Sequence, residues 1–158
     1  MTSDNGIARR TLLMAGAAAI GGVVLSGCSA NGTPIKVYKD TGCGCCKKWV
    51  QKLQVAGFAT TVEDRDDLQD LKKQLGVPDD LASCHTAMVD RYVIEGHVPP
   101  GDIKRFLAEK PAAHGLSVPG MPVGSPGMEV EGQPSEAYTV WLFQDSGERT
   151  PFAKYAAT

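Results

Sequence analysis

Three cysteines within four residues, Cys43, Cys45 and Cys46, lie between a strand-like run and a helix-like run of the chain. The run before them alternates the apolar residues Ile35 and Val37 with longer polar or amphipathic ones, as a half-buried strand does. The cysteines therefore lie at the amino end of a helix, where unpaired amides and the helix dipole lower the pKa of a thiol. We expect these sulfurs to be reactive or bound to a metal, because the thiolate is both the nucleophilic and the metal-binding form of cysteine.

Residues 1–27 are typical of an export signal. A pair of arginines precedes the apolar stretch Leu12–Leu25, which is shorter than the roughly 20 residues that span a bilayer. The paired arginines resemble a twin-arginine signal, and Leu25–Cys28 resembles a bacterial lipobox, which would make Cys28 the first mature residue and its lipid anchor. An ordinary cleaved signal with a nearby cysteine is the alternative. Both predict export, with residues 28–33 as a short tether.

The rest of the chain, residues 34–158, is long enough for one domain with a single modest core. The whole chain carries 16 basic and 18 acidic residues, of which the export signal contains two and one, so the mature chain has a net charge of about −3. This balance argues against a nucleic acid partner, because binding to phosphates requires a basic surface.

Hydrophobic periodicity predicts an α/β domain. In chain order the predicted elements are a strand at 35–38, a helix from Cys46 to near Gly57, a strand at 58–62, a helix at 68–75, a hairpin formed by 87–89 and 92–94, a short helix between Pro100 and Pro111, and a strand at 138–143 that leads into a closing hairpin. This order matches a thioredoxin-like layout, a central mixed sheet flanked by helices in which the turn after the first strand meets the turn before the third. Cys84 and His85 occupy the second of these turns, so we expect them to face the clustered cysteines.

Residues 115–134 contain nine glycines and prolines, which is too many for a helix or a central strand and predicts a long loop. Met121 and Met128 lie within it. Because long loops inside a compact domain are usually functional, the paired thioethers suggest a metal lid. Methionines that only fill gaps, or a flexible linker with incidental methionines, are the alternatives.

The mature chain beyond Cys28 has an even number of cysteines, which in an oxidising compartment allows two structural disulfides. The spacing argues against this, since the neighbours Cys45 and Cys46 pair poorly and Cys43 with Cys46 has the C-x-x-C spacing of redox or metal sites. Thiolate, thioether and imidazole donors together favour copper, and Cu(I) in particular. An iron–sulfur cluster and a structural zinc site are alternatives, but neither explains the methionines.

Two of the three histidines are candidate ligands. His85 adjoins Cys84, but neighbours in an extended segment point to opposite faces, so a supporting role is as well founded as coordination. His97 is placed to reach the cluster from the end of the predicted hairpin or to form a surface hydrogen bond. His114 is expected to face solvent.

Four motifs in order resemble the bacterial CopG-like family, long described as a domain of unknown function. They are residues 41–46, 84–87, 95–99 and 118–129, within a resemblance that covers about residues 34–145. The resemblance implies a thioredoxin-like periplasmic protein that binds several copper ions in a sulfur-rich cluster and is associated with copper resistance through Cu(I)/Cu(II) interconversion. The ligands that it implies are the thiolates of Cys43, Cys45, Cys46 and Cys84, with Met121, Met128, His85 and His97 as candidate outer ligands.

The leading hypothesis is a membrane-tethered, extracytoplasmic protein that sequesters copper, either by binding alone or as a copper oxidoreductase, and passes it to an exporter or a periplasmic metallochaperone. The alternative is a thiol–disulfide oxidoreductase that uses Cys43 and Cys46. Such enzymes usually have a proline before the third strand, where this chain has Cys84 and His85. A free Cys45 would also invite mispairing in an oxidising compartment.

Overall fold

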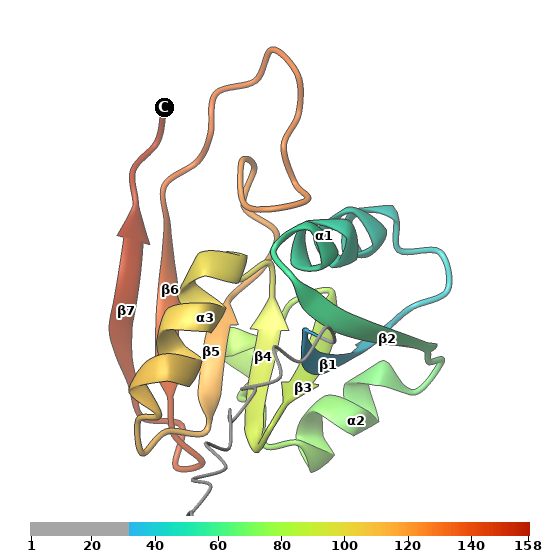
Figure 1. Ribbon diagram of the computed structural model, residues 1–158. Helices are drawn as coiled ribbons and strands as arrows, with labels where there is room; N and C mark the ends of the chain where they lie inside the picture. The colour runs from blue at the N-terminus through green and yellow to red at the C-terminus, as the bar shows by residue number, and fades with distance from the viewer. Residues whose placement is uncertain (1–31) are drawn as a thin grey trace, which may run out of the picture.

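The computed structural model describes residues 32–158 of the chain. The predicted export signal, the lipid site at Cys28 and most of the predicted tether lie outside the described residues. The described part is a seven-stranded mixed sheet with three α-helices packed against it, which confirms the predicted mixed α/β class (Figure 1). Among these residues no helix is both long enough and apolar enough to span a bilayer.

With two additions, a short 3₁₀ helix and the strand β5 (Gly115–Val118), the elements follow the predicted order. In chain order they are β1 (Thr33–Lys39), α1 (Gly44–Val55), β2 (Phe58–Asp64), α2 (Leu68–Gln74), a short 3₁₀ helix (Asp79–Leu81), β3 (His85–Val89), β4 (Tyr92–Gly96), α3 (Pro100–Glu109), β5 (Gly115–Val118), β6 (Tyr138–Phe143) and β7 (Arg149–Tyr155). The strand order is β2-β1-β3-β4-β5-β6-β7. β1 is parallel to β2 and β4 is parallel to β5, whereas the other neighbours are antiparallel.

The helix that carries the cysteines forms where it was predicted, because its apolar residues recur on one face. The buried side chains of α1 are Cys46, Trp49, Val50 and Leu53. Gly57 follows the helix with a φ of 90°, a left-handed conformation that suits glycine at a helix end. The indole Nε1 of Trp49 donates a hydrogen bond to the Val98 carbonyl at 2.9 Å, so α1 is tied to the segment that follows β4.

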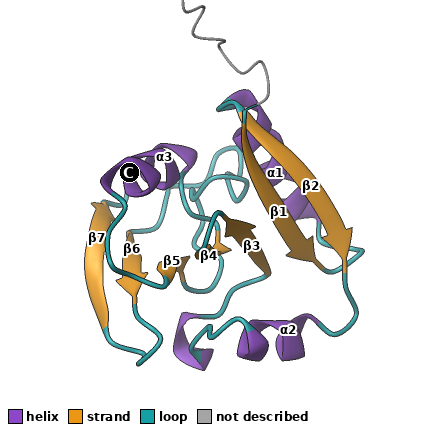
Figure 2. Ribbon diagram, turned by 60° about the horizontal axis from the view of Figure 1, so that its bottom comes forward, coloured by secondary structure: helices purple, strands orange, loops and turns teal. Residues whose placement is uncertain are grey.

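Helices cover both faces of the sheet. α1 and α3 lie on one face and α2 on the other (Figure 2). The larger core lies on the first face and includes Trp49 of α1 and Phe106 of α3, each fully buried. A smaller core contains Val77 and Leu81, which follow α2, together with Val93 and Phe143 from the sheet. Burial of each large apolar side chain contributes about 1.5–3 kcal/mol, so the larger core holds α1 firmly in place.

The prediction of a continuous loop over 115–134 is wrong at its start, because Gly115–Val118 forms β5. This strand is fully buried and lies between β4 and β6. A Cβ atom at position 115 would collide with the backbone of Val93 on β4. The glycine that suggested a loop therefore permits a close approach of two strands. The segment without regular secondary structure covers 119–137, apart from one bridge at Gly120.

Both predicted hairpins are confirmed. β3 and β4 are joined by a tight turn in which Asp90 has a φ of 51°, a left-handed conformation that aspartate tolerates. β6 and β7 form the closing hairpin, and Gly147 has a φ of 83° in its turn. The closing hairpin completes the sheet next to β5, so the long loop is an internal connection of the domain.

Strand directions bring the four family motifs, at residues 41–46, 84–87, 95–99 and 118–129, to the same end of the strands. β1, β4 and β5 run in the same direction, and β3 runs in the opposite one. The carboxyl ends of β1, β4 and β5 therefore lie beside the amino end of β3, where Lys39 pairs with His85. The cysteine turn follows β1, Cys84 precedes β3, His97 follows β4 and the long loop follows β5.

Candidate metal centre

The cysteine turn lies at the amino end of α1, as predicted. Cys43 is the N-cap residue, and its Sγ accepts a hydrogen bond from the backbone amide of Cys46 at 3.3 Å. Cys46 is fully buried, whereas Cys43 and Cys45 are partly exposed. The turn therefore presents sulfur both to the core and to the surface.

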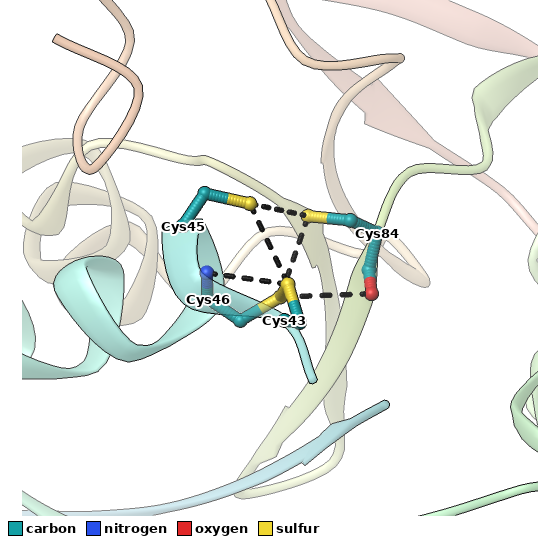
Figure 3. Close-up of side chains that lie close together, drawn as sticks. All are labelled: Cys43, Cys45, Cys46 and Cys84. Atoms are coloured by element: carbon teal, nitrogen blue, oxygen red, sulfur yellow. Dashed lines mark hydrogen bonds between the residues drawn. A yellow bond between two sulfur atoms is a disulfide. The ribbon is translucent and has the colours of Figure 1, made fainter. Parts of the chain in front are cut away.

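Cys84 brings a fourth sulfur to this turn, as the predicted meeting of the two turns requires (Figure 3). Its Sγ lies 3.9 Å from that of Cys45 and 3.6 Å from that of Cys46, and the sulfurs of Cys43 and Cys45 are 3.5 Å apart. All four sulfur atoms lie within 4.8 Å of one another. Such a group has the compactness that a shared metal centre needs.

The oxidation state of the turn differs from the expected set of four thiolates. Cys43 and Cys46 form a disulfide, with Cα atoms 5.4 Å apart, while Cys45 and Cys84 are free. The C-x-x-C spacing on one helical turn places these two sulfurs side by side, which is the reason that this pair rather than another is joined. Two sulfur donors are available in the oxidised form, and reduction would supply two more.

His97 adds an imidazole to the site. Its Nε2 lies 3.0 Å from the Sγ of Cys84, and its Nδ1 lies 2.8 Å from the carbonyl oxygen of Pro126. Because a carbonyl only accepts, Nδ1 carries the proton and the lone pair of Nε2 faces Cys84. A backbone carbonyl that holds one ring nitrogen while the other is free to bind is the usual arrangement of a metal-binding histidine.

His85 also faces Cys84, although neighbours in a regular strand would point apart. Cys84 lies in a bend before β3, and this turns both side chains to the same side, with the Nδ1 of His85 3.2 Å from the Sγ of Cys84. The ring is fully buried, packs at 4.3 Å between centroids on Trp49, and has no hydrogen-bond partner at Nε2. A buried ring nitrogen without a partner is costly unless a ligand or another group satisfies it. Cys84, His85 and His97 thus form a second donor group that shares Cys84 with the first.

The protonation states of these donors follow from burial. Burial and the neighbouring Cys45 raise the pKa of Cys84 to about 12, so without a metal it is a thiol at neutral pH. Burial also lowers the pKa of His85 and of His97 below the usual value. Both rings are therefore neutral at neutral pH, which is the form of imidazole that binds metals. A metal at Cys84 must displace a proton.

A buried ion pair, which sequence reasoning missed, supports the segment around Cys84. The carboxylate of Glu95 accepts hydrogen bonds from the Lys72 ammonium at 2.5 Å, the Ser83 amide at 2.7 Å and the Thr86 hydroxyl at 2.7 Å. Lys72 and Glu95 are both nearly or fully inaccessible to water. The available signal was a lysine four residues after Leu68, on the side of α2 that carries its leucines, and a glutamate within the apolar run of β4. Ser83 and Thr86 flank Cys84 and His85, so the pair fixes the backbone on both sides of these donors.

The long loop is fastened across the site at three points. Gly120 forms a parallel bridge with Ser83, and the carbonyl of Pro126 accepts the hydrogen bond from His97. Gly127, with a φ of 92°, lies so close to α1 that an added Cβ atom would be 2.8 Å from the amide nitrogen of Trp49 and 2.9 Å from the carbonyl oxygen of Cys45. The loop therefore covers the cysteine turn as a packed segment.

The two methionines of the loop are placed differently. Met128 lines a surface pocket of about 310 Å³ together with Cys45, Lys48 and Glu129. Met121 directly follows the bridge at Gly120 and is 52% exposed. The loop thus brings Met128 to the same pocket as a free thiol and leaves Met121 largely exposed. His114, expected to face solvent, is instead half-buried between the carbonyl of Leu75 and Asp145, away from the cysteines.

We predict that Gly127→Ala destabilises the fold more than a matched glycine substitution does. The new methyl group would meet backbone atoms of α1, which cannot move aside as a flexible side chain can. Gly132→Ala is the control, since Gly132 also has a positive φ, 75°, but has open space around it. The difference in the free energy of unfolding, measured with denaturant, should be about 1–3 kcal/mol. Equal losses in the two variants would mean that the loop does not pack against α1.

The fold and its donors define a class, a mixed α/β protein with a cysteine and histidine centre able to hold a soft metal ion. Residues 81–128 match the family described as "Protein of unknown function, DUF411". Two solved structures, described as forms 1 and 2 of "Copper resistance protein copG", are similar over most of the chain. Form 1 is 42% identical, with a TM-score of 0.75 and coverage of 80% of this chain and 99% of its own. Form 2 is 42% identical, with a TM-score of 0.73 and coverage of 77% and 97%.

At this identity and coverage, the chain belongs to the CopG family. The family resemblance predicted from the four motifs is therefore confirmed. None of the curated proteins matches the chain. The DUF411 match includes Cys84, both candidate histidines and both loop methionines, but it does not extend to the cysteine turn.

Proposed function

We propose that this chain is an extracytoplasmic copper-binding protein of copper resistance, which holds Cu(I) in a sulfur-rich centre at the carboxyl edge of β1. The observation that carries the proposal is the sharing of Cys84 between two donor groups, one of four sulfurs and one of a thiol and two imidazoles. Sulfur and neutral imidazole are the donors that Cu(I) prefers. The relatives described as copper resistance proteins support the choice of copper.

The residues have distinct roles in this proposal. Cys43, Cys45, Cys46 and Cys84 are thiolate ligands once the disulfide is reduced. His97 binds through Nε2, which faces Cys84, and His85 through Nδ1, which lies 3.2 Å from the same sulfur. Met128, which shares a pocket with Cys45, and Met121, which follows Gly120 in the chain, supply weaker thioether donors from the loop.

A centre with this many donors can hold more than one ion, because a thiolate is able to bridge two Cu(I) ions. We therefore propose several copper ions per chain and interconversion of Cu(I) and Cu(II) as part of copper handling. The first half of the domain, a parallel β1-α1-β2 unit followed by the β3–β4 hairpin and α3, supports a thioredoxin-like relationship.

The proposed location rests on the predicted export signal, and the proposed partners rest on the binding of copper. The export signal predicted at residues 1–27 supports export to the periplasm and attachment to a membrane through a lipid on Cys28. Copper held by thiolates close to a surface pocket is accessible to ligand exchange, which supports transfer to a copper exporter or a periplasmic metallochaperone.

The test is a Cu(I) titration of the reduced, full-length chain with Cys28→Ser, under anaerobic conditions and with elemental analysis. We expect several Cu(I) ions per chain, and fewer in a Cys45→Ser variant because this thiol lies within 4 Å of two other sulfurs. Met88→Leu, a substitution at a half-buried methionine of the smaller core, is the control and should bind as the unsubstituted chain does.

Absence of tightly held copper in the unsubstituted chain would contradict the proposal. If the Cys43–Cys46 disulfide then also exchanged rapidly with a model dithiol, the thiol–disulfide oxidoreductase would become the better hypothesis. The presence of that disulfide is the one observation in its favour. Cys84 directly precedes β3, where such enzymes usually have a proline.

A further inference from the structure

The four sulfurs of the site form two unlike pairs. Cys43 and Cys46 are joined within a single helical turn, so this pair can open and close with little backbone movement. Cys45 and Cys84 come from separate elements, and their free sulfurs are 3.9 Å apart. Joining them would require α1 and the segment before β3 to move until the sulfurs were about 2 Å apart. Oxidation therefore joins Cys43 to Cys46 and leaves Cys45 and Cys84 as free thiols.

Each sulfur of the joined pair contacts one of the free thiols. The Sγ of Cys43 lies 3.5 Å from that of Cys45, and the Sγ of Cys46 lies 3.6 Å from that of Cys84 (Figure 3). Cys45 also lines the surface pocket, and Cys84 faces the imidazole nitrogen of His97. The free thiols are thus placed to hold copper directly beside the pair.

We propose that the Cys43–Cys46 dithiol is an electron donor to copper, and that Cys45, Cys84 and His97 retain the Cu(I) that is formed. Two Cu(II) ions each take one electron, the two S–H bonds break, one S–S bond forms, and two protons pass to water. The products are one Cys43–Cys46 disulfide and two Cu(I) ions. This inference rests on the proposed copper-binding function and adds the source of the electrons.

The same reaction changes the set of ligands. In the dithiol form four sulfurs are available, whereas in the disulfide form the free donors are two thiols and two imidazoles. A disulfide sulfur is a much poorer ligand than a thiolate. The number of copper ions held therefore falls when the pair closes, which couples the oxidation state of the pair to the release of copper.

The test uses the full-length chain with Cys28→Ser, so that the four site cysteines are its only thiols. The chain is reduced, freed of reductant under argon and mixed with two equivalents of Cu(II). We expect the Cu(II) signal in electron paramagnetic resonance to disappear, a Cu(I) chelator to recover two Cu(I) per chain, and the number of thiols to fall from four to two. Peptide mapping should then find the Cys43–Cys46 disulfide, with Cys45 and Cys84 alkylated.

Two double variants separate the roles. Cys43→Ser/Cys46→Ser should keep the Cu(II) signal, while Cys45→Ser/Cys84→Ser should remove it but release the Cu(I) to a weak chelator. A persistent Cu(II) signal in the unsubstituted chain, or a disulfide between any other two cysteines, would overturn the inference without depending on how either variant folds. A parallel titration with Cu(I) distinguishes the two proposals: if Cu(I) binds but Cu(II) is not reduced, only the electron-donor role fails.

Discussion

A Cys84→Ala variant is expected to lose most of its affinity for Cu(I). Cys84 belongs to both donor groups, with sulfur neighbours at 3.6 and 3.9 Å and the imidazole nitrogen of His97 at 3.0 Å. Its removal leaves neither group complete. Loss of a group that only orients a ligand already weakens metal binding 10–100-fold, so loss of this shared ligand should cost more than about 100-fold. Competition with a chromophoric Cu(I) chelator measures the change.

A comparison with Cys45→Ala shows whether the membership of Cys84 in both donor groups strengthens Cu(I) binding. Cys45 belongs only to the sulfur group, so its loss leaves the group formed by Cys84, His85 and His97 intact. We expect a smaller loss of Cu(I) affinity than for Cys84→Ala, measured by the same competition. Equal effects of the two substitutions would mean that the imidazoles do not take part in binding, and an unchanged affinity in Cys84→Ala would contradict the proposed centre.

Lys72→Met should destabilise the fold by about 3–5 kcal/mol, because it leaves the buried carboxylate of Glu95 without its ammonium partner. The two remaining donors, the Ser83 amide and the Thr86 hydroxyl, do not neutralise the charge. The double variant Lys72→Met/Glu95→Leu removes both charges and should recover most of the loss. Unfolding in denaturant gives the free energies.

The same chemical change at an exposed ion pair is the control. Lys36 pairs with Glu63 at 2.8 Å, but both side chains are more than a third exposed, so Lys36→Met should have little effect. If Lys72→Met were as mild as Lys36→Met, the buried pair would not be a fixed support of the segment around Cys84. Because Ser83 and Thr86 flank Cys84 and His85, the destabilised variant should also bind Cu(I) more weakly.

Much of the secondary structure could be predicted because it depends on local patterns. The apolar face of α1, the turn at Asp90 and the strand Tyr138–Phe143 each follow from residues a few positions apart. β5 was missed because it is only four residues long and its glycine signals a loop, whereas the close approach to β4 that requires this glycine is a contact between distant segments.

The candidate site was only partly accessible to sequence reasoning. The cysteine turn at the start of α1 and its meeting with Cys84 were predicted and are confirmed. The pair of Lys72 and Glu95 was not found, because lysine and glutamate are usually solvated and no local pattern pairs two residues that lie on separate elements. The orientation of His85 was left open, since the bend at Cys84 and the contact of the ring with Trp49 cannot be seen in a local pattern.

The type of chemistry can be read from the amino-acid sequence: soft sulfur donors at a helix amino terminus, with imidazole and thioether donors elsewhere in the chain. These properties reside in single side chains and short turns. That the donors form one centre depends on the fold, because strand order and direction place the ends of β1, β4 and β5 beside the start of β3. The sharing of Cys84 by both donor groups also depends on the fold, since the distances between Cys84 and the cysteine turn are set by the packing of the sheet and α1.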